Sequence, residues 1–428
     1  MNNKIGLKEA MSIGIGGMVG GGIFAVLGLA VSYAKGGTPI AFLFAGIVAL
    51  ITGYSYSKMS LKYPDRGGTV KFINQGFGIN VFSGAMNNFL WVSYIIMLSL
   101  YASAFGSYAP NLLKILGGKV DFHLYVSLVI IVATFVNYYS IQMVGKIESI
   151  VVAIKLIILI SFVFIGGYGL FGNNHLDQLE ISYWTHPIEL ISGAMVIFVA
   201  YEGFELIANA APDIENPQSN IPKAYFYSII FVIILYISIS IVTVGSLAFS
   251  EIAKAQDYVL AEAAKPMLGQ AGFVIITIAA LLSTFSAINA TLYGGSRVNY
   301  EIAKDRELPK NFTSMLWNQP IGLFITFIST LLMANLVDLT NISIAGSIGF
   351  LLVFALVNLA CFKLSEELNS NKLLTMAGFL LCIIALAVLI ISQFSSQKIG
   401  VFMALGIIVF CVFAEWIYIK KSRNLGFG

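Results

Sequence analysis

The sequence predicts an all-α protein that crosses a membrane many times, and three observations lead to this fold class. Hydrophobic residues make up 58% of the 428-residue chain and charged residues only 11%, whereas a soluble domain carries about 25% charged residues. The mean hydropathy is +0.88. Apolar runs of about 20 residues, long enough to cross a bilayer, follow one another along the chain. These observations exclude a soluble protein, and the small net charge of +3 gives no indication of nucleic-acid binding.

Polar breaks divide the chain into twelve predicted transmembrane helices. Their expected spans are 10–34, 39–62, 82–109, 122–141, 146–171, 188–209, 222–248, 270–299, 320–336, 341–363, 373–393 and 399–419. Twelve helices with short connections account for nearly the whole length, so we expect a single transmembrane domain over residues 1–428. The lipid bilayer is its expected surrounding, and no obligate protein partner is indicated.

The distribution of Lys and Arg predicts that both termini lie in the cytoplasm, because cytoplasmic segments carry an excess of these residues. With the N-terminus inside, 17 of the 24 Lys and Arg residues fall in cytoplasmic segments and 6 fall on the other side. The remaining one, Lys155, lies within a predicted helix. We expect a multi-pass protein of the cell (inner) membrane.

Two of the twelve helices have interiors that are unsuited to a continuous helix. In the first, IGIGGMVGGGIF places six glycines between Gly14 and Gly22, and glycine is a poor helix former. In the sixth, FVAYEGFE places Glu202 and Glu205 on either side of Gly203, and a charge at membrane depth is costly. We expect both helices to be interrupted, which a membrane tolerates only where the backbone lines a cavity or is buried in protein.

Breaks in helices 1 and 6 predict two units of five helices each. Because five is an odd number, the second unit starts on the opposite side of the membrane and is inverted relative to the first. An inverted repeat with broken helices is a transporter architecture. The predicted repeats are residues 10–171 and 188–363, followed by two additional helices over 373–419.

The ends of an interrupted helix can bind a zwitterion, because free N–H groups attract anions and free C=O groups attract cations. The amides of Gly21, Gly22 and Ile23 open the second half of helix 1, and we expect them to hold a carboxylate. The expected ammonium ligands are backbone carbonyls near the two breaks, at Met18, Val199, Ala200 and Glu202. The alternative for the glycines is close helix packing alone. Both charges within one site fit an α-amino acid.

Four segments resemble the amino acid–polyamine–organocation superfamily of permeases. GMVGGGIF is similar to the glycine-rich signature of its first helix, and YPDRGGTVKFINQGFG to the loop after its second. FVAYEGFE with DIENPQSNIPKA resembles its sixth helix and the following loop, and SRVNYEIAKDRELP the end of its eighth. The segments keep the family's order, although KDRELP replaces the Asp-Gly that many members have after the basic residue.

The resemblance implies the LeuT-type five-plus-five inverted repeat, usually with two additional helices. It also implies transport of amino acids or amines by proton symport, sodium symport or exchange. The substrate carboxylate would bind at Gly21, Gly22 and Ile23. An aromatic gate beside the sixth-helix break would correspond to Phe198 or Tyr201, and the sequence leaves both open.

Lys155 is the candidate for coupling transport to an ion gradient. It lies about nine residues into predicted helix 5, so roughly 13 Å into a core about 30 Å thick, where a lysine costs about 2.5–3.5 kcal/mol. The resemblance places helix 5 beside the first break and helix 8, where sodium-coupled relatives bind a cation and some proton-coupled members have a lysine. The expected neighbours of its ammonium group are the carbonyls of Gly17 and Gly20 and the hydroxyls of Ser283 and Ser286.

A proton is therefore the expected coupling ion, and Glu205 is the second candidate to carry it. The alternative is a structural Lys155 that only bonds the carbonyls of a broken helix. Helices 3, 8 and 10 contain no acid in mid-span, which favours a neutral amino acid as substrate. An amino acid–amine exchanger of the same superfamily is the rival interpretation.

A membrane enzyme is disfavoured because the sequence offers no intramembrane nucleophile, general base or metal cluster. The three cysteines, Cys361, Cys382 and Cys411, fall in separate apolar runs. We expect no cofactor and no bound metal.

The topology can be tested with a reporter that is active only in the periplasm. Fused after Gly428, it should be inactive, because the charge distribution places the C-terminus inside. Insertion into the 172–187 or 249–269 connections should give strong activity. Strong activity of the fusion after Gly428 would contradict the predicted orientation.

Overall fold

The computed structural model describes residues 4–139, 141–172, 175–305, 307–308, 310–316 and 319–424. Arg306 and Pro309, which belong to the fourth family-like segment, lie outside the described residues, as do the two ends of the chain. Within the described part, the fold is almost entirely helical, with one two-residue antiparallel hairpin, β1 (Met315–Leu316) and β2 (Gln319–Pro320).

Nine helices in the described residues are long and apolar enough to cross a membrane. They are α3 (Thr38–Lys62), α5 (Val81–Tyr108), α6 (Gly118–Tyr139), α7 (Ile141–Gly169), α10 (Pro217–Ser246), α13 (Lys265–Lys304), α15 (Leu339–Lys363), α17 (Lys372–Ser396) and α18 (Lys398–Asn424). The all-α polytopic class predicted from composition is confirmed.

Two further spans are bent pairs, at the two places where the sequence predicts interruptions. The first pair is α1 (Leu7–Met18) and α2 (Gly22–Ala34), which meet at 45°. The second is α8 (Pro187–Val196) and a helical segment over Phe198–Asp213, which meet at 41°. Both interruptions are therefore confirmed. The ninth predicted span corresponds to α14 (Ile321–Leu336), which has only 16 residues, so a total of twelve crossings stays a prediction.

Short helices form in connections that the sequence analysis treats as loops. They are α4 (Thr69–Phe77), α11 (Phe249–Lys254), α12 (Val259–Glu262) and α16 (Ser365–Leu368), whereas α9 (Leu206–Ala210) belongs to the sixth predicted span. The connections also hold single turns of 3₁₀ helix, η1 (Ala109–Asn111), η2 (Leu170–Gly172), η3 (Leu176–Leu179), η4 (Ile181–Tyr183), η6 (Ala211–Asp213), η7 (Gln256–Tyr258) and η8 (Lys310–Thr313). Such turns satisfy backbone groups where the chain leaves a longer helix.

Polar caps fix where several long helices begin. The Asn80 side chain accepts hydrogen bonds from the amides of Phe82 and Ser83 at the start of α5, at 2.8 and 3.3 Å. Asp338 and Asn371 cap α15 and α17 in the same way. These side chains satisfy amides that the helices themselves leave free.

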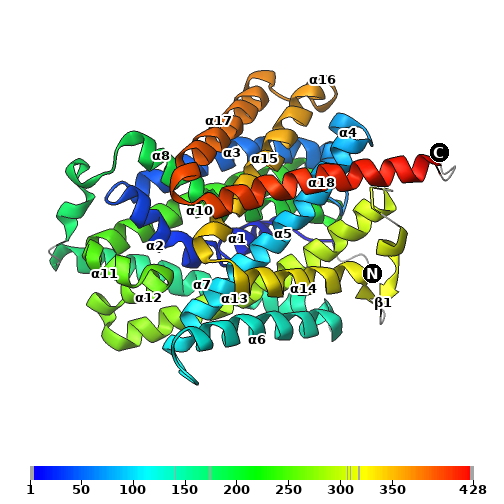
Figure 1. Ribbon diagram of the computed structural model, residues 1–428. Helices are drawn as coiled ribbons and strands as arrows, with labels where there is room; N and C mark the ends of the chain where they lie inside the picture. Colours follow the sequence, from blue (N-terminus) through cyan, green and yellow to red (C-terminus); the bar gives the residue numbers. More distant parts are fainter. Residues whose placement is uncertain are drawn as a thin grey trace.

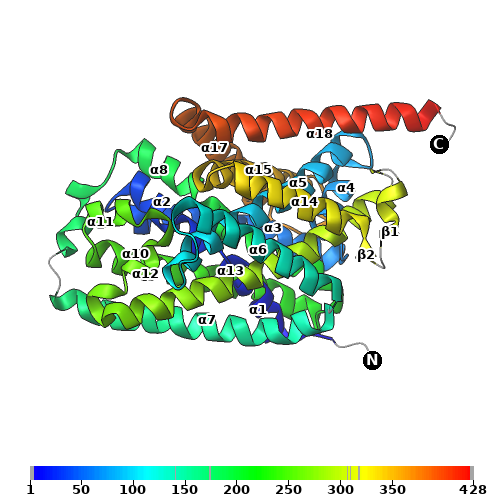
Figure 2. The same ribbon diagram turned by 60° about the horizontal axis from the view of Figure 1, so that its bottom comes forward.

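The broken helices occupy the middle of the bundle, and uninterrupted helices surround them (Figure 1). The 3₁₀ segment η5 (Phe198–Glu205), which starts the second half of the second broken helix, is buried at all eight residues. Helix α10 packs against α3 and α1, and α13 packs against α5 and α7. Figure 2 shows α7 and α18 on opposite outer sides of the bundle. Their most apolar stretches are each only 28% buried, so they present apolar side chains outward, as lipid contact requires.

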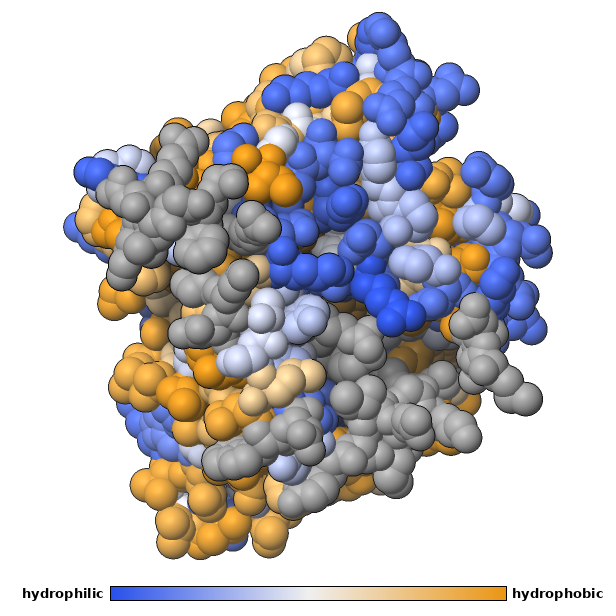
Figure 3. All heavy atoms as spheres, turned by 90° about the vertical axis from the view of Figure 1, so that its right-hand side faces the viewer, coloured by the Kyte–Doolittle hydropathy of each residue, from blue (hydrophilic) through white to orange (hydrophobic). Residues whose placement is uncertain are grey.

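The start of α1 and the end of α18 lie at the same end of the bundle (Figure 1). Figure 3 looks onto this end, where hydrophilic residues gather. Exposed ion pairs connect the segments here, including Lys62–Glu367 at 3.6 Å and Lys372–Glu366 at 2.9 Å. Exposed pairs contribute little to stability, but they identify the polar face that the lysine distribution predicts to be cytoplasmic.

The two broken helices cross through glycine. A Cβ atom at Gly17 would lie 2.7 Å from the carbonyl oxygen of Gly203, and a Cβ at Gly203 would overlap the backbone between Gly17 and Met18. Real Cβ atoms do not approach so closely, so only glycine permits this crossing. It is the small-residue helix contact that membranes favour.

Replacing Gly203 with Ala should therefore destabilise the protein by about 1–3 kcal/mol, as overpacking does, and lower its melting temperature in detergent. Gly406→Ala is the matched control, because the structure places no atom within 4 Å of its Cβ position and alanine favours the helix by up to about 1 kcal/mol. A Gly203→Ala protein that melts as high as the wild type would contradict the close crossing.

Candidate functional site

The first break leaves helix ends of opposite polarity facing each other. Helix α1 ends at Met18, and the Gly20 amide turns back to the carbonyl of Gly17 at 3.3 Å. Helix α2 starts one turn later with Gly21 as its N-cap, and no side chain caps its first amides. The amides of Gly21, Gly22 and Ile23 therefore open a helix as expected, and these three residues are buried.

Other segments pack closely against the first glycines of α2 in the described conformation. The ring of Tyr101 on α5 lies directly against Gly21, where a Cβ atom would overlap it. A Cβ at Gly22 would lie 2.8 Å from the Cα of Ala200. Both glycines thus serve close packing here.

The second break is a tightened helix rather than an open gap. Residues Phe198–Glu205 form the 3₁₀ helix η5. Hydroxyl groups of α15 satisfy the backbone where α8 stops, because Ser343 and Ser347 both donate to the carbonyl of Val196 at 2.9 Å. Ser347 also accepts from the amide of Val199 at 3.1 Å. Side chains of a neighbouring helix thus replace backbone bonds that are lost at the break.

Two of the carbonyls expected to hold an ammonium group converge on one hydroxyl. Tyr236 on α10 lies within hydrogen-bonding distance of the carbonyl oxygens of Met18, at 2.6 Å, and Ala200, at 3.3 Å. The carbonyls are therefore brought together as predicted, but they are not left free. The Tyr236 hydroxyl therefore occupies the position expected for the ammonium group of a substrate.

The two candidates for an aromatic gate face different helices. The Phe198 ring packs edge-on against Phe354 of α15, with centroids 5.9 Å apart. The Tyr201 ring packs against Tyr236 at 5.2 Å, and its hydroxyl donates to the carbonyl of Phe42 on α3 at 2.9 Å. Both are fully buried, and the choice between them stays open.

The 3₁₀ winding brings Glu202 and Glu205 onto one face, because residues three apart eclipse each other in such a helix. Both side chains are buried, with 3% and 1% of their surface exposed. Glu202 accepts from the Tyr101 hydroxyl at 3.1 Å. Glu205 accepts from Tyr56 at 3.3 Å and from Thr69 at 3.1 Å. Neither forms an ion pair within the described part of the chain.

Lys155 is completely buried on α7 and reaches the end of α1. Its Nζ donates to the carbonyl of Gly16 at 3.0 Å, one residue before the expected Gly17. Ser283 of α13 donates to the carbonyl of Val19 at 2.7 Å and also bonds that of Gly20. Ser286, the fourth expected neighbour, is buried on the same helix. The junction of α1, α7 and α13 thus places the Lys155 amine at the carbonyl end of α1, the negative end of its helix dipole.

A polar cluster near the predicted cytoplasmic end joins two of the family-like segments. Glu307 accepts from Asn87 at 2.6 Å, Asn74 at 3.3 Å and Ser83 at 3.1 Å. Burial raises the pKa of the Glu307 carboxyl, and these three hydrogen bonds oppose the rise. Asn74 also donates to Asp305 at 3.0 Å, so α4 is fixed to the end of α13.

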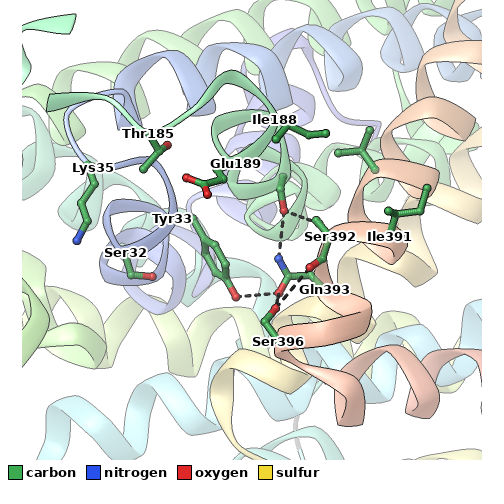
Figure 4. A pocket seen from close by; sticks show the side chains of 12 residues that line it. Ser32, Tyr33, Lys35, Thr185, Ile188, Glu189, Ile391, Ser392, Gln393 and Ser396 are labelled. Atoms are coloured by element: carbon green, nitrogen blue, oxygen red, sulfur yellow. Dashed lines mark hydrogen bonds between the residues drawn. The ribbon is translucent and has the colours of Figure 1, made fainter. Parts of the chain in front are cut away.

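A separate pocket of about 590 Å³ lies at the opposite end, among α2, α8 and α17. Figure 4 shows Gln393 at its centre, accepting from Tyr33 at 2.9 Å and donating to Ser192 at 3.1 Å. None of the predicted site residues lines this pocket. The pocket therefore lies at the contact of α17 with α2 and α8, away from both helix breaks.

Sequence reasoning missed the side chains that surround the two breaks. They are Tyr56, Tyr101, Tyr236, Ser343 and Ser347. Each lies on a helix far along the chain from its partner, so no local motif contains it. The available signal was the presence of hydroxyl side chains inside otherwise apolar helices.

The comparisons with known proteins agree with this geometry. A family model described as amino acid permease matches residues 5–419. An uncharacterized protein of Methanocaldococcus jannaschii is 33% identical, over 99% of this chain and 97% of that protein. The inner membrane transport protein YbaT of Escherichia coli is also 33% identical, over 99% of this chain and 98% of its own length.

A third relative is the branched-chain amino acid permease BcaP of Bacillus subtilis, which is 23% identical over 86% of this chain and 82% of its own. The Escherichia coli and Bacillus subtilis relatives are a transport protein and a permease rather than enzymes, in agreement with the sequence analysis. The family match spans both broken helices and nearly all of the chain. The chain therefore belongs to the amino acid permease family.

Proposed function

We propose that this permease is a proton-coupled symporter of neutral amino acids that works by alternating access. The observation that carries the coupling is Lys155, whose buried ammonium group contacts the carbonyl end of α1. A charged Lys155 stabilises the junction of α1, α7 and α13. Loss of its proton weakens this contact, because a neutral amine interacts less with the helix dipole. A proton can thereby bias which way the bundle opens.

The helix contacts support an inverted repeat as the moving framework. Counted as spans, helix 1 packs against helix 6 (α1 and η5), and helix 2 against helix 7 (α3 and α10). Helix 3 packs against helix 8 (α5 and α13), and helix 4 against helix 9 (α6 and α14). Pairing of elements five apart is what a two-fold axis between two five-helix units produces, and inverted units allow the same site to open to either side.

The proposed substrate site lies where the two broken helices meet. The carboxylate binds the amides of Gly21, Gly22 and Ile23, and the ammonium group replaces the Tyr236 hydroxyl at the carbonyls of Met18 and Ala200. A neutral side chain fits the absence of mid-span acids in α5, α13 and α15. The name of the Bacillus subtilis relative adds branched-chain amino acids to the first candidates.

The direct test is uptake of labelled amino acids by proteoliposomes. The panel contains leucine, valine, alanine, lysine and agmatine, each with a proton gradient, a sodium gradient or no gradient. We expect accumulation of a neutral amino acid that needs the proton gradient and no sodium. Uptake that instead requires an amino acid or amine inside the vesicle would identify an exchanger and contradict symport.

Replacing Lys155 with Met should separate binding from accumulation. Methionine retains much of the side-chain length without the charge, so the variant should bind substrate but fail to concentrate it under an imposed proton gradient. In the wild type, uptake should rise as the external pH falls, because the inward proton gradient increases.

Lys398→Met is the matched control, since Lys398 lies at the start of α18, far from the break in sequence, and is exposed. It should accumulate substrate like the wild type. If Lys155→Met also accumulates substrate against its gradient, Lys155 is structural and the coupling proton resides on another group, with Glu205 the next candidate.

A further inference from the structure

The pocket among α2, α8 and α17 lies at the level of the membrane surface. Three helices end around it, because α2 ends at Ala34, α8 begins at Pro187 and α17 ends at Ser396. The ends of membrane-spanning helices lie near the lipid head groups. The pocket volume of about 590 Å³ falls in the range of small-molecule sites, about 300–1,000 Å³. The pocket is therefore large enough for a ligand and lies within reach of lipid.

Two side chains of opposite charge line this pocket. Lys35 follows the end of α2, and Glu189 lies in the first turn of α8. Both side chains are exposed, and neither forms an ion pair with another residue in the described part of the chain. Glu189 also stabilises the positive end of the α8 dipole, but that effect gives no reason for a lysine in the same pocket. The two charges favour a ligand that carries both signs.

Aliphatic side chains line the rest of the pocket wall. Figure 4 shows Lys35 at one side of the pocket, Ile391 at the other and Glu189 between them. Ile188 and Ile391 are 66% and 74% exposed, so the pocket opens toward the surroundings of the bundle. Val388 lies two turns before the end of α17, roughly 12 Å deeper in the membrane. The lining thus changes from charged at the surface to aliphatic at the depth of acyl chains.

We propose that this pocket binds a phospholipid with an ethanolamine head group. The phosphate contacts Lys35, and the primary ammonium group donates hydrogen bonds to Glu189. One acyl chain lies along Ile188, Val388 and Ile391. The inference does not depend on the coupling ion or on the amino acid that is carried.

Other ligands match only part of this lining. An anionic phospholipid without an amine leaves the Glu189 carboxylate unpaired and repels it. A choline head group carries a positive charge but has no N–H to donate to Glu189. A free amino acid carries both charges, but it is too short to extend from the charged side chains to Val388.

Bound lipid would contact the outer halves of both broken helices and α17 together. Gln393 of α17 already connects these helices, because it accepts from Tyr33 of α2 and donates to Ser192 of α8. The lipid therefore strengthens a contact that the hydrogen bonds of Gln393 begin.

The test is a competition between two lipids for the purified protein in detergent. Phosphatidylethanolamine and phosphatidylcholine with identical palmitoyl and oleoyl chains are added in equal amounts, and native mass spectrometry measures the ratio of the two lipid-bound species. The wild type should prefer phosphatidylethanolamine about threefold to fivefold, the size expected for one exposed ion pair. Lipids that only surround the protein without a site would give a ratio of about one.

Glu189→Gln should lower this ratio to about one, because the amide keeps the shape of the side chain without its charge. Glu180→Gln is the matched control, since Glu180 is exposed in the connection before α8 and does not line the pocket. It should keep the wild-type ratio.

The contact of Lys35 with phosphate has its own competition, between phosphatidylethanolamine and a diacylglycerol with the same chains. The preference of the wild type for the phospholipid should fall about threefold to fivefold in Lys35→Gln, for the same reason. Lys254→Gln is the control, because Lys254 is exposed at the end of α11 and lies outside the pocket lining.

Three results would overturn the inference. Equal binding of the two lipids by the wild type would mean that no ethanolamine site exists. A preference that survives in Glu189→Gln would place the lipid elsewhere on the protein. Displacement of the lipid by excess L-leucine would assign the pocket to a soluble amino acid instead. None of these measurements uses transport, so they leave the proposed symport to its own test.

Discussion

The structure depends on one constraint: backbone groups freed by a broken helix must find partners inside the protein, because the bilayer core offers none. The break in the sixth span uses Ser343 and Ser347 of α15. The break in the first span uses Tyr236 of α10, Ser283 of α13 and Lys155 of α7. Side chains of four helices, α7, α10, α13 and α15, thus bond the free backbone groups of the two breaks. This explains why the broken helices lie at the centre of the bundle.

The same constraint explains the glycines. Partners can reach the free backbone groups only if the two broken helices lie close together, and Gly17 and Gly203 permit backbone-to-backbone contact. Glycine therefore has two consequences here. It weakens the helix locally, which favours the break, and it removes the side chains that would keep the breaks apart. Packing and ligand binding are not competing explanations for these residues.

The sequence predicts the helices and their two interruptions well, because both follow from local composition. An apolar run of 25 residues or a cluster of six glycines is visible without knowing its neighbours. The contacts at the site follow from no such pattern, since Tyr236 lies 218 residues from Met18 and Lys155 lies 139 residues from Gly16. Gly16, the described partner of Lys155, is next along α1 to Gly17, one of its expected neighbours.

The 3₁₀ form of the second break was also beyond local reasoning. Residues three apart eclipse each other in a 3₁₀ helix, so Glu202 and Glu205 share one face of η5. That face meets Tyr94 and Tyr101, which are seven residues apart on α5 and so share one side of it. The Tyr101 hydroxyl donates a hydrogen bond to Glu202, and its ring packs against Gly21 at the start of α2.

Tyr101 and Tyr236 pack into the proposed substrate site. The Tyr236 hydroxyl bonds the carbonyl end of α1, the proposed ammonium position, and the Tyr101 ring packs against Gly21 at the start of α2, beside the proposed carboxylate position. A carrier closed by its own side chains can pass through the occluded conformation without cargo. A symporter needs that passage to return after releasing its substrate, whereas an exchanger must prevent it. A site that its own side chains can close is therefore what the proposed symport requires.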